Sequence, residues 1–275
     1  MSIISKKTKR SFDVFLIIAA FLVVFPYIWM FFTSFKPVEE VFTDKLSIFP
    51  STWKFSNYAE VFTGSLLSSI LNSFLVVFIG VILDVLISFI AGYAFARMNF
   101  YGRQIIFLLI LGTLMIPSQV LMLPSYILMG KLGWLNSYIG LIVPRLSPAF
   151  GMFLVRQFIM TVPDDIEEAA YLDGAPLFTR IFKIYWPICF PAVTTLGVFS
   201  LIGYWNDYYW PLMIISDKDY RTLSLAIAQY KNVEGMGNWS QEMAAAVVAT
   251  VPMIILFLVA RKKLIGNITE GAVKG

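Results

Sequence analysis

Histidine is absent from the 275 residues, and cysteine occurs only once, as Cys189. Without histidine the chain lacks the commonest general base and metal ligand of proteins. A single cysteine cannot form an intrachain disulfide. The sequence has no zinc-ligand spacing, no Cys/His nucleophile pair and no phosphate-binding loop. We therefore expect no catalytic residue, no metal site and no cofactor held by this chain.

Charged residues are also scarce, at 14% of the chain, whereas soluble domains contain about 25%. Hydrophobic residues make up 59%, and the mean hydropathy is +0.77. The net charge of +4 is modest and gives no indication of a nucleic-acid partner. This composition predicts an integral membrane protein that contacts lipid.

Six apolar runs are long enough to cross a bilayer, which takes about 20 residues as a helix. The predicted spans are 12–33, 68–95, 104–127, 137–159, 188–214 and 242–261. The first run is longer than the apolar region of a signal peptide, about 7–15 residues, so we interpret it as a retained span. The predicted fold class is all-α integral membrane, with six transmembrane helices.

The distribution of lysine and arginine predicts the orientation of the spans. With the N-terminus inside, thirteen of the 21 basic residues fall on the cytoplasmic side. These are Lys6, Lys7, Lys9, Arg10, Arg97, Arg103, Arg156, Arg180, Lys183, Arg261, Lys262, Lys263 and Lys274. We expect both termini in the cytoplasm. The predicted organisation is an anchor helix with an external loop (1–67), a permease core (68–261) and a cytoplasmic tail (262–275).

A charged island, residues 160–187, separates the fourth and fifth spans. Pro163 suits the first position of a helix, and Asp164 and Asp165 would then stabilise its positive end. Gly174 stands where a left-handed cap would end this helix, and Pro176 would begin a second one. The pattern alone is equally consistent with an ordinary solvated loop.

The island resembles the EAA loop of the inner-membrane permease subunits of ABC importers. In this loop E-A-A is followed after three residues by glycine, and after nine more by I-x-L-P. The chain has Glu168-Ala169-Ala170, Gly174 and Ile184, but Trp186 in place of the usual leucine. Since Trp186 lies at the membrane edge, we expect it to alter packing there more than docking.

Further stretches resemble the shorter six-span subunit of the maltose-type sugar permeases. They read "AGYAFARMNFYGRQIIF", "MIPSQVLMLPSYILMGKLGWLNSYIGLIVP", "GYWNDYYWPL" and "LIGNITEGAVKG". The resemblance implies a permease of a bacterial cytoplasmic-membrane importer for a carbohydrate, in the first place an oligosaccharide. Alternatives are a permease for another polar solute and a self-sufficient secondary transporter. An intramembrane enzyme would need a cluster of acid and base groups, which the sequence does not provide.

The resemblance also implies the partners: a second homologous permease, two ATPase subunits and an extracytoplasmic sugar-binding protein. ATP and Mg would be bound by the ATPase subunits, so this chain would not itself be an enzyme. The island would dock on an ATPase and transmit its motion. The residues expected to carry this coupling are Glu167, Glu168, Ala169, Ala170, Asp173 and Gly174.

Polar residues within the apolar runs are costly in a membrane and are candidates for function. Arg145 lies eight residues after Ser137, and Asp207 lies eight residues before Ile215. At 1.5 Å per residue, both would sit roughly 12 Å below the outer edge. We therefore predict that they pair, or share a polar cluster with Asn206, in the pathway or at its gate. The alternative is that Arg145 extends alone to the lipid headgroups.

Overall fold

The computed structural model describes residues 6–43, 47–63, 66–146, 148–228 and 238–272. Within this part of the chain every regular element is a helix, which confirms the predicted all-α class. The predicted tail, 262–275, lies outside the residues whose side chains are described. The chain divides into two compact units, one formed by Met1–Leu67 with Ala226–Pro252 and the other by Ser68–Leu225 with Met253–Gly275.

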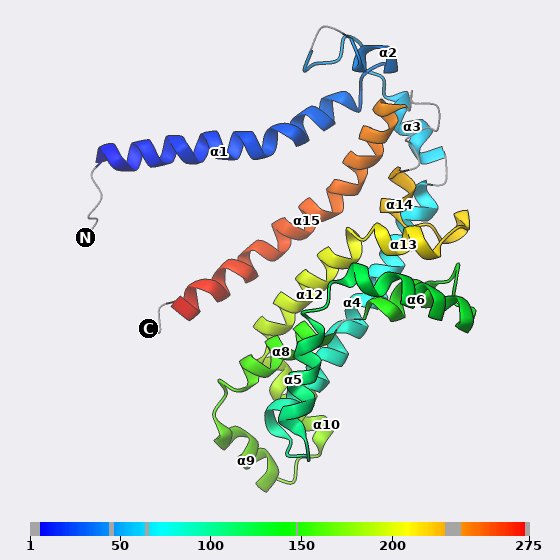
Figure 1. Cartoon of the computed structure of the whole chain (residues 1–275). Helices are drawn as coiled ribbons and strands as arrows, with labels where there is room; N and C mark the ends of the chain where they lie inside the picture. The colour runs from blue at the N-terminus through cyan, green and yellow to red at the C-terminus, as the bar shows by residue number, and fades with distance from the viewer. Residues whose placement is uncertain (1–5, 44–46, 64–65, 147, 229–237, 273–275) are drawn as a thin grey trace. The chain divides into compact units, whose positions relative to one another are not determined.

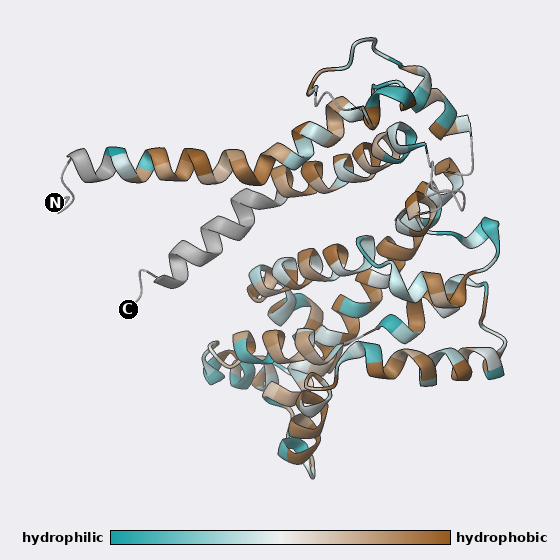
Figure 2. Ribbon diagram, turned by 45° about the horizontal axis from the view of Figure 1, so that its top comes forward, coloured by the Kyte–Doolittle hydropathy of each residue, from teal (hydrophilic) through white to brown (hydrophobic). Residues whose placement is uncertain are grey.

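The first unit contains a long apolar helix followed by a folded loop. The helix is α1 (Lys6–Thr33), which is hydrophobic along most of its length (Figure 2). The loop contains α2 (Val38–Val41) and α3 (Ser56–Thr63). The buried Asn57 amide holds this loop by donating to the carbonyls of Ser34 and Lys36, at 2.9 and 3.1 Å. In sequence, α14 (Leu223–Ala228) and α15 (Trp239–Ala272) continue from one unit into the other.

The second unit is arranged along the 32-residue helix α4 (Leu66–Arg97) (Figure 1). The elements that follow are α5 (Arg103–Thr113), α6 (Ser118–Leu132), α7 (Tyr138–Ile142), the 3-10 turn η1 (Val143–Arg145), α8 (Pro148–Ile159), α9 (Asp164–Leu172), α10 (Leu177–Thr179), the π-helical η2 (Arg180–Tyr185), α11 (Trp186–Ile188), α12 (Phe190–Trp205), α13 (Tyr209–Ile214) and the 3-10 turn η3 (Lys218–Tyr220).

Helices α4 and α8 pack closely because glycine lies at their contact. A Cβ atom on Gly151 would come within 2.3 Å of the Ser88 hydroxyl oxygen, and one on Gly92 within 2.7 Å of the Val155 side chain. Small residues at such contacts let helix backbones approach in membrane proteins. Around this contact lies a core of buried apolar and aromatic side chains, including Phe89.

In the described part of the chain, three helices are long and apolar enough to span a membrane: Arg10–Thr33, Leu66–Arg97 and Trp239–Val259. Three more spans are formed if each bent helix pair counts as one. These pairs are Arg103–Thr113 with Ser118–Leu132, bent by 96°, Tyr138–Arg145 with Pro148–Ile159, bent by 46°, and Leu177–Ile188 with Phe190–Trp205, bent by 82°. The chain is thus a multi-pass membrane protein with up to six spans.

The apolar run predicted as the fifth span, 188–214, is interrupted near both of its ends. The helix after Gly174 runs on to Ile188 and then bends into α12, next to Pro187 and Pro191. Proline has no N–H to donate, so it weakens the helix at such a bend. At the other end, α12 stops at Trp205 and the helix resumes as α13.

Candidate functional site

The charged island folds as helix, glycine turn and helix, as its sequence predicts. Helix α9 has three carboxylates in its first turn, and Gly174 follows its end with a φ of +70°. The Gly174 N–H donates to the Tyr171 carbonyl and the Ala175 N–H to the Ala170 carbonyl, both at 3.0 Å. These two hydrogen bonds together form a Schellman cap. Pro163, which we predicted at the first helical position, lies one residue earlier, at the N-cap.

Glu167 ties α9 to two other elements. Its Oε1 atom accepts from the Tyr93 hydroxyl of α4 at 2.8 Å and from Arg180 Nη1 of η2 at 2.6 Å. The Glu167 and Arg180 side chains are only 18% and 20% exposed. The carboxylate of Glu167 is therefore engaged within the chain rather than presented to a partner.

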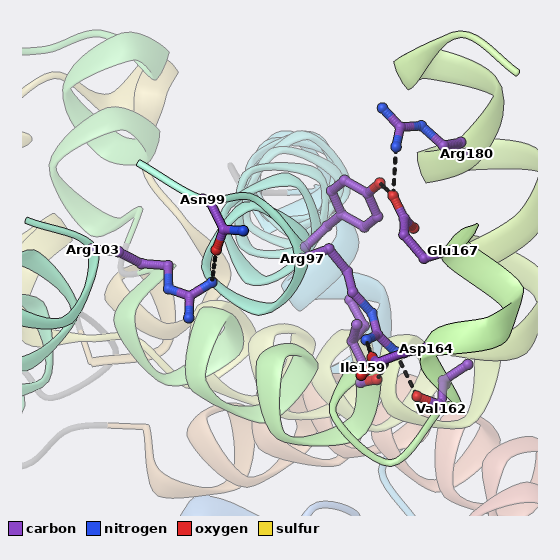
Figure 3. A network of polar contacts seen from close by, with 9 residues as sticks. Arg97, Asn99, Arg103, Ile159, Val162, Asp164, Glu167 and Arg180 are labelled. Carbon is purple, nitrogen blue, oxygen red and sulfur yellow. Dashed lines mark hydrogen bonds and ion pairs between the residues drawn. The ribbon is translucent and has the colours of Figure 1, made fainter. Parts of the chain in front are cut away.

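Arg97, the last residue of α4, forms a second tie beside the first. Its Nη2 atom donates to the carbonyls of Ile159 at 3.1 Å and Val162 at 2.5 Å, where α8 ends. Its Nη1 atom pairs with Asp164, at the start of α9. Figure 3 shows Arg97 reaching these three residues while Glu167 faces Arg180. The guanidinium thus satisfies carbonyls that a helix end leaves free and fixes the first residue of α9.

Five other residues of α9 and its cap form an exposed face. Glu168, Ala169 and Asp173 are exposed, and so are Tyr171 and Leu172, at 73% and 85%. We name these five residues the α9 face. Ala170 is buried instead, at 5% exposure, so the predicted coupling residues divide between an anchored side and an open side.

Arg145 and Asp207 form the ion pair that we predict from their equal depth below the outer edge of the membrane. Arg145 Nε lies 2.8 Å from Asp207 Oδ2, with side-chain exposures of 33% and 15%. The Arg145 guanidinium also lies 5.9 Å from the centre of the Tyr204 ring. The exposed Asn206 amide donates to the Ile202 carbonyl one turn back, at 3.0 Å. The described contacts therefore show the pair and do not place Asn206 in it.

Sequence reasoning missed the residues that anchor α9 from a distance. Tyr93 and Arg97 stand 74 and 67 residues before their partners Glu167 and Asp164. The sequence signal that could have indicated them is that Tyr93 and Arg97 lie one helical turn apart where the second apolar run ends. Among the described residues, no group of three or more cysteine, aspartate or glutamate side chains could hold a metal ion.

Comparison with known proteins assigns this arrangement to a family. Residues 84–264 match the family described as binding-protein-dependent transport system inner membrane component. This chain belongs to that family. The matched residues include α9, its anchors on α4 and the Arg145–Asp207 pair.

Full-length relatives agree with this assignment. The chain is 33% identical to the arabinooligosaccharides transport system permease protein AraQ of Halalkalibacterium halodurans, over 93% of each chain. It is 30% identical to the trehalose/maltose transport system permease protein MalG of Thermococcus litoralis, over 94% of each. Its fold is that of a chain in a bacterial ABC transporter involved in the import of the acidic polysaccharide alginate, with a TM-score of 0.85, 23% identity and coverage of 95% and 99%.

Proposed function

We propose that this inner membrane component is the permease subunit of an ATP-driven importer that carries a carbohydrate, in the first place an oligosaccharide. The relatives named for arabinooligosaccharide and for trehalose and maltose transport support the substrate class. The chain itself supplies the transmembrane pathway and is not the ATPase. ATP and Mg are bound by the partner subunits, which act on this chain mechanically.

The observation that carries this proposal is the α9 face. A tyrosine and a leucine that are about three-quarters or more exposed, next to carboxylates, are typical of a contact surface rather than of a solvated loop. Glu168 supplies a charge for a basic residue of an ATPase, while Ala169 lets the partner approach closely. Glu167 acts from the other side as an anchor, and Gly174 allows the turn without strain because it tolerates a positive φ.

The same proposal specifies the assembly. Two ATPase subunits lie below the membrane, one against α9 and one against the matching loop of a second, homologous permease. An extracytoplasmic sugar-binding protein delivers the cargo from the other side. Both termini lie in the cytoplasm of a bacterial cell, the core is 68–261, and the tail is 262–275.

The test is a charge reversal on the α9 face. Glu168→Lys should lower ATP-driven sugar uptake by tenfold or more, since a mispaired charge at a partly buried interface costs about 2 kcal/mol or more. The complex should still be recovered from the membrane. Glu39→Lys is the matched control because Glu39 is exposed in the loop after α1, and its uptake should equal that of the wild type.

The runner-up function is a secondary transporter that needs no ATPase. It predicts uptake that continues without ATP and collapses when the ion gradient is removed. If ATP depletion does not lower wild-type uptake and Glu168→Lys leaves uptake unchanged, the protein is a secondary transporter and not an ATP-driven importer. Import of another polar solute would appear as ATP-dependent uptake of that solute with no uptake of any sugar.

A further inference from the structure

Three helix interruptions of the second unit meet at one cavity of about 360 Å³. The bend between α5 and α6 contributes Ser118 and Gln119, the end of η1 contributes Arg145, and the break between α12 and α13 contributes Asp207. Irregular backbone in a membrane protein is tolerated where it is buried in protein or lines a cavity. In many transporters interrupted helices form the substrate site. The convergence of three such interruptions therefore indicates a binding site.

The charges at this cavity cancel. Arg145 and Asp207 both line it and lie 2.8 Å apart, so each neutralises the other. An anionic ligand would have to compete with Asp207 for the guanidinium, and a cation would have to compete with Arg145 for the carboxylate. A neutral ligand faces neither cost.

The other lining groups fit a polyhydroxylated ring. Gln119 offers both an amide donor and a carbonyl acceptor, and the hydroxyls of Ser118 and Ser125 donate and accept. Tyr209, at the start of α13, is 66% exposed and adds an aromatic ring to the wall. Ser118 Oγ donates to Gln119 Oε1 at 3.4 Å, but an apolar solute would remove water from the other polar atoms and offer no hydrogen bond in return, which is costly. The volume lies within the range of small-molecule sites, roughly 300–1,000 Å³.

We propose that this cavity, which we name the break-point cavity, binds one neutral sugar ring of the cargo during its passage. The inference rests on the proposed function and adds that this subunit contacts the sugar directly. Gln119 and the serines would bind hydroxyl groups, Tyr209 would pack on the apolar face of the ring, and the Arg145–Asp207 pair would close one side.

The experiment uses the assembled importer, with both permeases, the ATPases and the binding protein, in proteoliposomes. The probes are radiolabelled maltose, arabinotriose and diacetylchitobiose, with digalacturonate as an acidic probe. The measured quantity is sugar carried per ATP hydrolysed. Gln119→Ala and Tyr209→Ala should each lower it by about five- to tenfold, the effect of losing one hydrogen bond or one packed ring. Tyr209→Phe, which keeps the ring, should restore most of it.

Two matched controls come from the same helices. Val120 and Leu212 are exposed residues of α6 and α13 that do not line the cavity, so Val120→Ala and Leu212→Ala should keep the wild-type ratio. Ratios for Gln119→Ala and Tyr209→Ala equal to these controls would overturn the inference while leaving the importer standing. A wild type that prefers digalacturonate would overturn the neutral class. A wild type that carries a sugar probe without hydrolysing ATP would overturn the proposed function and this inference with it. If Tyr209→Ala is not recovered, Gln119→Ala decides alone, because it truncates an exposed side chain.

Discussion

At the scale of single residues, the Arg145–Asp207 pair is neither a surface pair nor a fully buried one. The side chains are 33% and 15% exposed. Exposed pairs contribute about 0.2–1 kcal/mol, whereas removing one partner of a buried pair costs about 3–5 kcal/mol because the other charge is left uncompensated. Asp207 is the more enclosed of the two, so loss of the arginine should be the more damaging change.

We therefore predict non-additive losses in a double-mutant cycle. Arg145→Ala and Asp207→Asn should each reduce sugar uptake, Arg145→Ala by tenfold or more. The double variant should be no worse than the worse single variant, because the second change removes a charge that no longer has a partner. The measurement is initial uptake rate per recovered complex.

The matched cation for this cycle is Lys131, an exposed residue near the end of α6 outside the cavity. Lys131→Ala combined with Asp207→Asn should give the product of the two single effects. If the losses of Arg145→Ala and Asp207→Asn multiply in the same simple way, the pair has no role in transport.

At the scale of elements, α9 depends on its anchors. It has nine residues, and isolated helices shorter than about 12–15 residues are marginal in water. Of its exposed face, Tyr171 has its ring centre 6.0 Å from the Arg180 guanidinium. Its position is set by Ile166, which packs against the core, and by Tyr93, Arg97 and Arg180, which hold its start and its inner side. We therefore expect a movement of the α9 face to be transmitted to the end of α4.

Removal of an anchor should loosen α9 before it affects the rest of the second unit. In Arg97→Met, amide hydrogen exchange at residues 164–172 should accelerate by about five- to a hundredfold, which corresponds to a loss of about 1–3 kcal/mol in the opening free energy. Tyr93→Phe loses one hydroxyl and should show a smaller effect. Exchange is measured by mass spectrometry on the purified protein in lipid nanodiscs.

Arg103→Ala provides the comparison for this measurement. Arg103 lies in the same region (Figure 3), but it donates to the Met98 carbonyl and the Asn99 side chain, and these contacts do not involve α9. Its exchange profile over 164–172 should match the wild type. Equal acceleration in Arg103→Ala and Arg97→Met would mean that the region responds as a whole and that the anchors have no specific role.

At the scale of the whole molecule, the sequence predicted those features that depend on neighbouring residues or on the depth of a residue in its span. Gly174 was recognisable because few other residues end a helix with a positive φ, and the Arg145–Asp207 pair followed from counting residues from the span ends. The interruption at 206–208 was missed although Asn206 and Asp207 mark it, because aromatic and apolar residues continue on both sides of them. The Tyr93–Glu167 contact could not be foreseen, since no local pattern connects residues on different helices.

Helix α4 contacts η3 near its start and α9 at its end. Near its start, the Asn72 amide donates to the carbonyls of Asp219 at 2.7 Å and Arg221 at 3.0 Å, next to η3. At its end, Arg97 binds Asp164 of α9. The 25 residues from Asn72 to Arg97 span roughly 37 Å at 1.5 Å per residue, which exceeds the hydrocarbon thickness of about 30 Å. We therefore expect η3 and α9 on opposite sides of the membrane.

Cysteine labelling in intact cells tests this expectation together with the predicted orientation. In a Cys189→Ser background, Lys218→Cys in η3 should react with a membrane-impermeant maleimide added outside. Tyr101→Cys, a fully exposed site just after α4, should react only after permeabilisation. The reverse pattern would place both termini outside, and the orientation predicted from the lysine and arginine asymmetry would be wrong. Reaction of both sites from outside would mean that α4 does not cross the membrane, and the six-span arrangement would fail with it.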